Sequence, residues 1–385
     1  MSAVVDGRTA AALRDHAARL RERLGLVEAP ILSATGLWLL LGAVAEVVED
    51  PAERAALESV LGMPAPEASA VVAALLADPH PAVGAALGGW VRPDLTLRAP
   101  VPGPVPVVPL PGQAALDAWA REHTRDLIGS FPVQVDDRTL LLLASALVTE
   151  PRWRERLSTA RDGLLELDGE LQAVVPTESA GPVGVACPPT DDGIDVISVI
   201  AAPGVAPGEV WRAVDEVVAR RLGGALAHGD RPAGPLGDGH AWRVRERTES
   251  FTARRAPEDG AELWTGRLPA WHVDARHELT GAPGVVEVGR GLARLVPSAA
   301  LVDGLELRCV QAATATYDAT GFRAAAVTAL EMRAAGMPAY VDRTVRRVVL
   351  TFDRPHALVA VARGGSWEGL PLFHAWVTPA GTPRP

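Results

Sequence analysis

Residues 318–338, DATGFRAAAVTALEMRAAGMP, decide how the rest of the chain is interpreted. With a period of two, every charge from residue 322 onward falls on one face of this stretch. The charge-free face carries Phe322, Ala324, Ala326, Thr328, Leu330 and Met332, and the other face carries Arg323, Ala325, Val327, Ala329, Glu331 and Arg333. A strand that is covered on one side needs this alternation. The small residues at 324–326 would let such a strand enter between existing strands without disturbing their packing.

Local propensity favours a different structure for the same stretch. Ala, Leu, Glu, Met and Arg are strong helix formers, and Gly336 is a plausible helix end. The two interpretations are compatible if the segment is a helix or loop before some event and a strand after it.

The composition of the whole chain excludes several classes of protein. The chain has 385 residues, 48% of them hydrophobic, and a formal charge of −10. This excludes intrinsic disorder and argues against a nucleic-acid partner. Cys187 and Cys309 are too few for a disulfide scaffold, and we expect both to be free thiols. The sequence contains no Lys, which excludes every mechanism that needs one.

The chain ends and apolar runs give an expectation for location. Residues 1–30 are interrupted by charges and hold no secretory signal. The longest charge-free run, 29–45, is shorter than the roughly 20 apolar residues of a spanning helix. We therefore expect a cytoplasmic monomer without a membrane partner, with release from the cell as the alternative.

Periodicity predicts helices first and strands later. Helices are expected around Leu13–Leu24, at 33–48, from Pro51 to Leu61, at 113–128 and at 209–222. Seven prolines between residues 92 and 112 predict an extended edge segment or a linker. The apolar run at 139–148 predicts a strand covered on both faces in the middle of a large sheet, 194–202 predicts a second strand, and the chain from Glu262 onward is predicted to be mostly extended. This order of elements predicts an α+β fold.

Enzyme motifs are missing from the sequence. GxSxG, HExxH, CxxC and a glycine-rich dinucleotide loop do not occur. His228, Asp230, Asp238 and His240 cluster in HGDRPAGPLGDGH, where a solvated surface loop is a better interpretation than a metal site. We therefore expect no enzyme activity, no metal and no cofactor.

Six stretches in a fixed order resemble the serpins, and together they span nearly the whole chain. They are 31–43 (ILSATGLWLLLGA), 114–128 (AALDAWAREHTRDLI), 139–153 (ending ASALVTEPRW), 268–272 (LPAWH), 321–328 (GFRAAAVT) and 352–355 (FDRP), where His356 replaces the usual Phe. The hinge GFRAAAVTA is most similar to the actinobacterial serpin-like branch. The resemblance implies a single serpin-like domain over 1–385, with N-terminal helices packed on a large mixed β-sheet, further smaller sheets and an exposed reactive loop.

The resemblance also implies a function, inhibition of a serine protease by loop cleavage and strand insertion. The family's spacing from Gly321 places the cleaved bond at Ala335-Gly336, which suits an elastase- or subtilisin-like protease. A miscount of two residues would instead give Arg333 and a trypsin-like protease. The alternative is a non-inhibitory serpin-fold protein with a binding or scaffold role, or less readily a small-molecule enzyme.

Several positions depart from the family's pattern. Phe322 stands where a Thr is usual, at the first side chain to be buried on insertion, and overpacking there would cost about 1–3 kcal/mol unless the site is enlarged. Ser145 replaces an asparagine and Gln311 a histidine in the region where the sheet opens, which also includes Ser33. Residues 92–112 are expected to be shortened by the loss of one helix, and 337–351 to be longer than the usual return strand.

Overall fold

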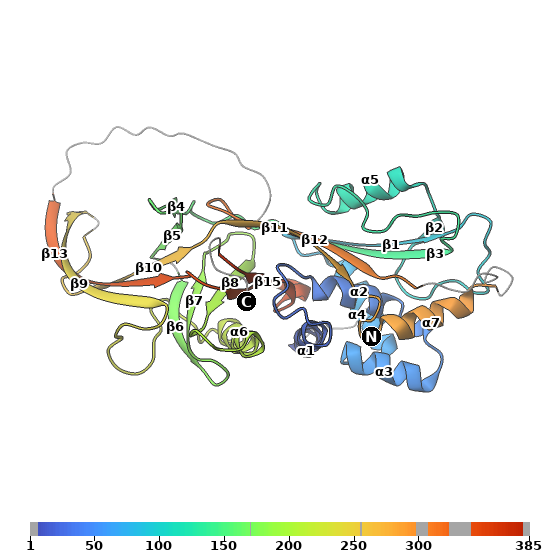
Figure 1. Ribbon diagram of the computed structural model, residues 1–385, viewed down its shortest axis with the longest axis horizontal. Coiled ribbons are helices and arrows are strands. Elements are labelled where there is room, and N and C mark those ends of the chain that lie inside the picture. Colours follow the sequence, from blue (N-terminus) through green and yellow to red (C-terminus); the bar gives the residue numbers. More distant parts are fainter. Residues whose placement is uncertain (1–6, 170, 255, 298–306, 323–339, 380–385) are drawn as a thin grey trace.

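The computed structural model describes residues 7–169, 171–254, 256–297, 307–322 and 340–379. Its helices are α1 (Gly7–Arg23), α2 (Ala34–Ala43), α3 (Pro51–Leu61), α4 (Ala65–Ala77), α5 (Gln113–His123), α6 (Pro207–Leu222) and α7 (Val285–Leu295), with short 3-10 turns at Ala45–Val47 and Gly365–Trp367. Its strands are β1 (Val83–Val91), β2 (Val107–Pro109), β3 (Leu141–Thr149), β4 (Ser158–Thr159), β5 (Leu165–Asp168), β6 (Leu171–Thr177), β7 (Gly181–Cys187), β8 (Ile194–Ile200), β9 (Trp242–Thr252), β10 (Glu262–Leu268), β11 (Trp271–Glu278), β12 (Val310–Tyr317), β13 (Tyr340–Thr351), β14 (His356–Ala362) and β15 (Pro371–Val377). Figure 1 shows their arrangement.

The strands form three units, which we name here. The buried sheet has the order β15-β14-β8-β7-β6, and the outer sheet has the order β4-β5-β10-β13-β9. The divided sheet consists of two parts, β2-β1-β3 and β11-β12. Among the described residues no pairing joins β3 to β12, so the divided sheet has a gap in its middle.

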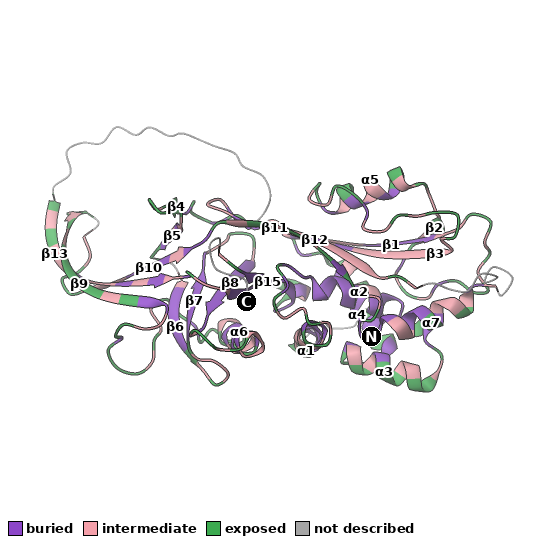
Figure 2. Ribbon diagram, in the orientation of Figure 1, coloured by how far each residue is buried: buried purple, intermediate pink, exposed green. Residues whose placement is uncertain are grey.

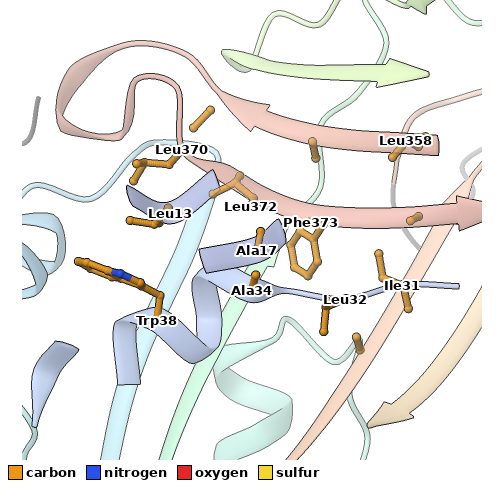
Figure 3. Close-up of a cluster of buried hydrophobic side chains, with 14 of the residues drawn as sticks. Leu13, Ala17, Ile31, Leu32, Ala34, Trp38, Leu358, Leu370, Leu372 and Phe373 are labelled. Carbon is orange, nitrogen blue, oxygen red and sulfur yellow. The ribbon is translucent and has the colours of Figure 1, made fainter. Parts of the chain in front are cut away.

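The main hydrophobic core joins the N-terminal helices to the buried sheet. Leu13 and Ala17 of α1 and Trp38 of α2 lie near Leu370 and Leu372 at the start of β15, and all of these side chains are nearly inaccessible to solvent (Figure 3). The other face of the buried sheet packs on the valines of α6. Figure 2 shows that most of β6, β7, β8 and α2 is buried.

Local sequence signals explain the helix boundaries. Asp50 caps α3 by accepting hydrogen bonds from the amides of Ala52 and Glu53, and Gly62 ends that helix with a φ of 73°. Ser33 caps α2 by accepting a hydrogen bond from the Gly36 amide at 3.1 Å.

Most sequence predictions of secondary structure are confirmed, with four corrections. The helix predicted for 33–48 ends at Ala43 and continues as a 3-10 turn, and α5 ends at His123 because Thr124 and the left-handed Arg125 and Asp126 break it. Helices α4 and α7 were not expected, and α7 interrupts the chain after Glu262 that was predicted to be mostly extended. Helix α4 buries alanines and valines, and α7 buries Val285 and Val288, so both helices are stabilised by packing of an apolar face.

Two further expectations can be compared with the structure. Residues 92–112 contain the short strand β2 and no helix, which agrees with the loss of one helix in this segment. Strand β13 is 12 residues long and pairs along most of its length with β9, and the expectation that residues 337–351 are longer than the usual return strand stays a prediction.

The structure describes no single helix with the length and hydropathy needed to cross a membrane; the bent pair α3 and α4 meets that test only when the two helices are taken together.

Candidate functional site: the gap in the divided sheet

A cavity of about 230 Å³ lies between β3 and β12. Residues along the full length of both strands line it, from Leu141 to Thr149 on one side and from Val310 to Thr316 on the other. The lining is mostly apolar, and each flanking strand presents an edge to the cavity that pairs with no described strand. Two facing, unpaired edges form a template that one additional strand could complete.

Strand β3 is covered on both faces, as the sequence predicted, but it lies at an edge of its part of the sheet. Leu143 and Leu147 point toward the main core beneath α2, whereas Leu142 and Ala144 point toward the cluster under α5. The prediction of a strand in the middle of a sheet is therefore wrong for this state, because its second neighbour is the cavity.

The N-terminus of α2 forms hydrogen bonds with residues on both sides of the cavity. The Ser145 hydroxyl on β3 donates a hydrogen bond of 2.6 Å to the Gly36 carbonyl. The Gln311 amide on β12 accepts from the Ser33 amide at 3.0 Å and donates to the Ser33 carbonyl at 2.8 Å. The Ser33 hydroxyl in turn donates to the Leu372 carbonyl of the buried sheet. The structure thus brings the three residues predicted for the sheet-opening region to one place beside the cavity.

Helix α5 and the chain that follows it cover the opposite side of the cavity (Figure 1). Trp119 packs edge-on against Trp90 of β1, with ring centroids 5.2 Å apart. Beyond the helix, the Arg276 guanidinium of β11 donates a hydrogen bond to the Pro132 carbonyl. This segment therefore crosses from the β1–β3 side to the β11–β12 side and acts as a strap over the cavity.

The chain turns back on itself directly after β12. The Asp318 carboxylate accepts hydrogen bonds from the Thr320 amide at 2.6 Å and the Gly321 amide at 3.2 Å, and these bonds fix a tight turn. A Cβ on Gly321 would lie 2.5 Å from the Pro151 carbonyl oxygen, so this close approach requires glycine. After the turn, Phe322 pairs antiparallel with Tyr317, and its amide donates to the Pro151 carbonyl at 3.0 Å.

The Phe322 ring already lies in an aromatic site at the upper end of the cavity. Only 3% of the residue is exposed, and its ring centroid is 6.1 Å from that of Trp271. Trp271 stacks on Tyr317, which also contacts Trp153. The ring is therefore already buried before any insertion, and the expected overpacking of the inserted strand stays a prediction. Large side chains from three other segments form a pocket that fits it before any loop movement.

The Tyr317 hydroxyl is the least satisfied polar group of this site. It is buried and has no hydrogen-bond partner among the described residues. Burial raises the pKa of Tyr317 well above its usual value. An unpaired buried hydroxyl costs about 1–3 kcal/mol, so this group destabilises the hinge in the present conformation.

The other predicted site residues fall into two groups. Arg323, Ala324, Ala325, Ala326, Val327, Thr328, Arg333, Ala335 and Gly336 lie outside the described residues, so their predicted roles stay predictions. In the His228–His240 loop, Asp230 accepts from the Ala227 amide, Asp238 binds Arg245, and His240 contacts the Pro182 carbonyl. Within the described part of the chain, no three His, Cys, Asp or Glu side chains come together as a metal site.

The aromatic pocket and the strap were not predicted from the sequence. Trp153 and Trp271 stand at or near the ends of two of the quoted family-like stretches, and this position was the available signal for the pocket. No sequence signal identified the contact between Arg276 and Pro132, because it joins segments that are distant in the chain.

Comparisons with known proteins show which solved structures share this fold. No protein-family model and no curated protein matches the sequence. Solved structures do match: a serpin from the trematode Schistosoma haematobium covers 98% of this chain and 99% of its own, with a TM-score of 0.60 and 11% identity. Thyroxine-binding globulin in complex with thyroxine covers 96% of this chain and 98% of its own, with a TM-score of 0.63 and 12% identity. The thermophilic serpin Tengpin in its native state covers 97% of this chain and 94% of its own, with a TM-score of 0.62 and 12% identity.

The fold is thus of the α+β class, with N-terminal helices packed against a mixed sheet that is divided around a cavity. It is the serpin fold, and it extends over nearly the whole chain.

Proposed function

We propose that this protein inhibits a serine protease by cleavage of residues 323–339 and insertion of the cleaved segment between β3 and β12. In the first step the protease serine attacks the carbonyl carbon of Ala335. The bond to Gly336 breaks, the new amine of Gly336 takes up a proton, and an ester joins the protease to Ala335. The segment from Phe322 to Ala335 then enters the cavity and carries the protease with it.

The observation that carries this proposal is the pairing at the hinge. Tyr317 pairs antiparallel with Phe322, and Arg152 pairs antiparallel with Gly321, so the chain leaves the turn antiparallel to both sides of the cavity. Extended by two residues, both pairings place Ala324 opposite Ala315 of β12 and opposite Thr149 of β3. An inserted strand from 324 to 332 would then match the whole length of β3 (Leu141–Thr149).

The same register places the charge-free face of the segment toward the core. Thr328 falls opposite Ser145 and Gln311, whose side chains both reach α2. Residues that pair directly share a face, so the apolar side chains at even positions would point to α2 and the charged ones to α5. This agreement between hinge register and alternation is independent of the family resemblance.

The class of target protease is inferred from the residue before the cleaved bond. Ala335 suits an elastase- or subtilisin-like protease, and cleavage after Arg333 would identify a trypsin-like one. The expected cytoplasmic location makes an intracellular protease, or one released by the same cells, the target. We propose a monomer as the active form.

The test is a thermal melt before and after limited proteolysis within 321–338, with the cut located by mass spectrometry. We expect cleavage to raise the melting temperature strongly, because the new strand pairs with two open edges. An unchanged midpoint would contradict insertion and favour the non-inhibitory alternative.

A matched pair of variants tests the register. Thr328→Arg places a charge on the face that would point to α2, whereas Ala329→Arg places the same charge on the outer face. We expect the first variant to be cut without forming an SDS-stable adduct and the second to form adduct as the wild type does. Equal adduct yields would contradict the register.

A further inference from the structure

Strands β9 and β13 form a long antiparallel ribbon at the end of the outer sheet (Figure 1). Their pairing runs without interruption from Trp242 opposite Leu350 to Thr252 opposite Tyr340. Tyr340 is the first residue after the segment 323–339, so the ribbon begins where the proposed bait loop ends.

Five arginines share one face of this ribbon. The register places Arg245 opposite Arg347, Arg247 opposite Val345 and Arg343 opposite Glu249, and alternate residues of a strand point to the same side. We call this set the arginine face: Arg243, Arg245, Arg247, Arg343 and Arg347. Glu249 is the one carboxylate that these two strands place on it. The opposite face carries Glu246, Asp342 and Arg346.

Carboxylates neutralise only part of the arginine face. Glu249 binds Arg347 at 2.8 Å and Arg247 at 2.7 Å, and Asp238 binds Arg245 at 3.0 Å. The guanidinium groups of Arg243 and Arg343 donate to backbone carbonyls and form no salt bridge among the described residues, although Asp238 also interacts electrostatically with Arg243. Asp168 of β5, which is separated from β13 by β10, adds one further negative charge near Arg347. An excess of positive charge therefore remains.

This excess is the reverse of the charge of the whole molecule. The chain carries a formal charge of −10, so a face on which five arginines outnumber the nearby carboxylates is a local exception. The exposed fractions of the Arg245 and Arg247 side chains are 63% and 59%, which makes them accessible to a partner. A surface of this kind attracts acidic surfaces over a distance set by the ionic strength.

We propose that the arginine face docks an acidic surface of the protease that attacks the loop, and this inference rests on the proposed function. Ala335 precedes Tyr340 by five residues, so the attacked bond lies within about 18 Å of the ribbon even if the chain between them is fully extended. A protease domain of about 220 residues has a radius of gyration of about 17 Å. A protease bound at the bond therefore reaches the arginine face.

The effect of this docking is on the rate of encounter. Complementary charges near a binding site accelerate association about 10- to 1,000-fold at low salt, and screening removes most of that gain. The arginine face would thus select among proteases that recognise the same residue but differ in surface charge.

The test uses an anionic and a cationic trypsin, because Arg323 and Arg333 supply trypsin sites in the loop. The rate of the first cut within 323–339 is measured for the wild type and for the triple variant Arg243→Gln, Arg247→Gln, Arg343→Gln. The control is Arg23→Gln, Arg161→Gln, Arg212→Gln, which removes the same charge from exposed positions elsewhere. We expect the triple variant to be cut about 10-fold more slowly than the wild type by the anionic trypsin at low salt. The control should be cut like the wild type, and the difference should vanish in about 0.5 M salt.

Equal slowing of both triple variants, or equal rates with both trypsins, would overturn the proposal. Loss of binding to a DNA duplex or a heparin column without any change in cutting rate would also overturn it and would make the face a polyanion site. The first cut occurs whether or not the loop inserts. A charge-dependent cut without an SDS-stable adduct would therefore disprove inhibition while upholding the docking surface, and the reverse result would do the opposite.

Discussion

The buried sheet and the divided sheet are built from similar apolar strands but are completed differently. In the buried sheet, every residue of β8, β14 and β15 is buried, and β14 pairs with a strand on each side. In the divided sheet, most residues of β3 are only partly buried (Figure 2), and one of the edges of β3 lies along the cavity. The inner strands of the buried sheet are thus paired on both sides, whereas β3 and β12 of the divided sheet each keep one edge that pairs with no described strand and could pair with an additional one.

A small number of contacts fix the residues around the gap between β3 and β12. The α2 N-terminus fixes Ser145 and Gln311, and Asp318 fixes the turn that directs Phe322 into the upper end of the cavity. A closed sheet and an open sheet in one chain should respond differently to mutation, to pH and to the removal of buried polar groups.

The largest expected effect comes from truncating a matched leucine in each sheet. Leu358→Ala in β14 removes a fully buried side chain and should lower the free energy of unfolding by about 2–5 kcal/mol. Leu142→Ala in β3 should lower it by only about 1–2 kcal/mol, because that side chain is partly exposed and borders an existing cavity. Urea denaturation of both variants measures the difference. Equal losses would show that the two sheets are packed equally tightly.

Acid should weaken the buried sheet through His356. Burial lowers the pKa of this histidine to about 4 from its usual 6.5. Because the folded pKa is depressed, the unfolded chain takes up the proton first, so the stabilisation is complete above pH 6.5 and is lost as the pH falls toward 4. This residue alone should account for a loss of about 3 kcal/mol between pH 7 and pH 4.

The variant His356→Phe tests this expectation and restores the residue of the family-like FDRP stretch. Its urea midpoint should fall less than that of the wild type when the pH is lowered from 7 to 4. An identical fall in both proteins would place the acid sensitivity elsewhere, and His16, whose pKa burial also lowers to about 4, is then the next residue to replace.

The smallest effect is expected at the hinge of the divided sheet. Tyr317→Phe removes a buried hydroxyl without a partner and keeps the ring that stacks on Trp271. We expect a gain of about 1 kcal/mol in the uncleaved protein, seen as a higher melting temperature. Destabilisation by this substitution would mean that the hydroxyl is satisfied in solution.

The candidate site was predictable where its signals are local. The alternation after Gly321 is a property of neighbouring residues, and Ser33 and Ser145 stood in stretches with a family-like pattern, whereas Gln311 stood outside them and was named only through the family resemblance. The environment of Phe322 was not predictable, because Trp153, Trp271 and Tyr317 come from three separate segments of the chain. The sequence alone therefore predicted that this ring would hinder strand insertion, whereas the packing around it shows a pocket that accepts the ring before insertion.

The sequence by itself determined the α+β class, most helices, the extended proline-rich segment and a stretch whose charges fall on one face. These follow from periodicity and turn chemistry, which act between residues close in the chain. Only the tertiary structure decided that β3 and β12 are separated by a cavity and that both strands form hydrogen bonds with the N-terminus of α2. It also decided that the arginines of β9 and β13 share a face. Strand register and side-chain packing join residues far apart in the chain, and no local pattern specifies which of them meet.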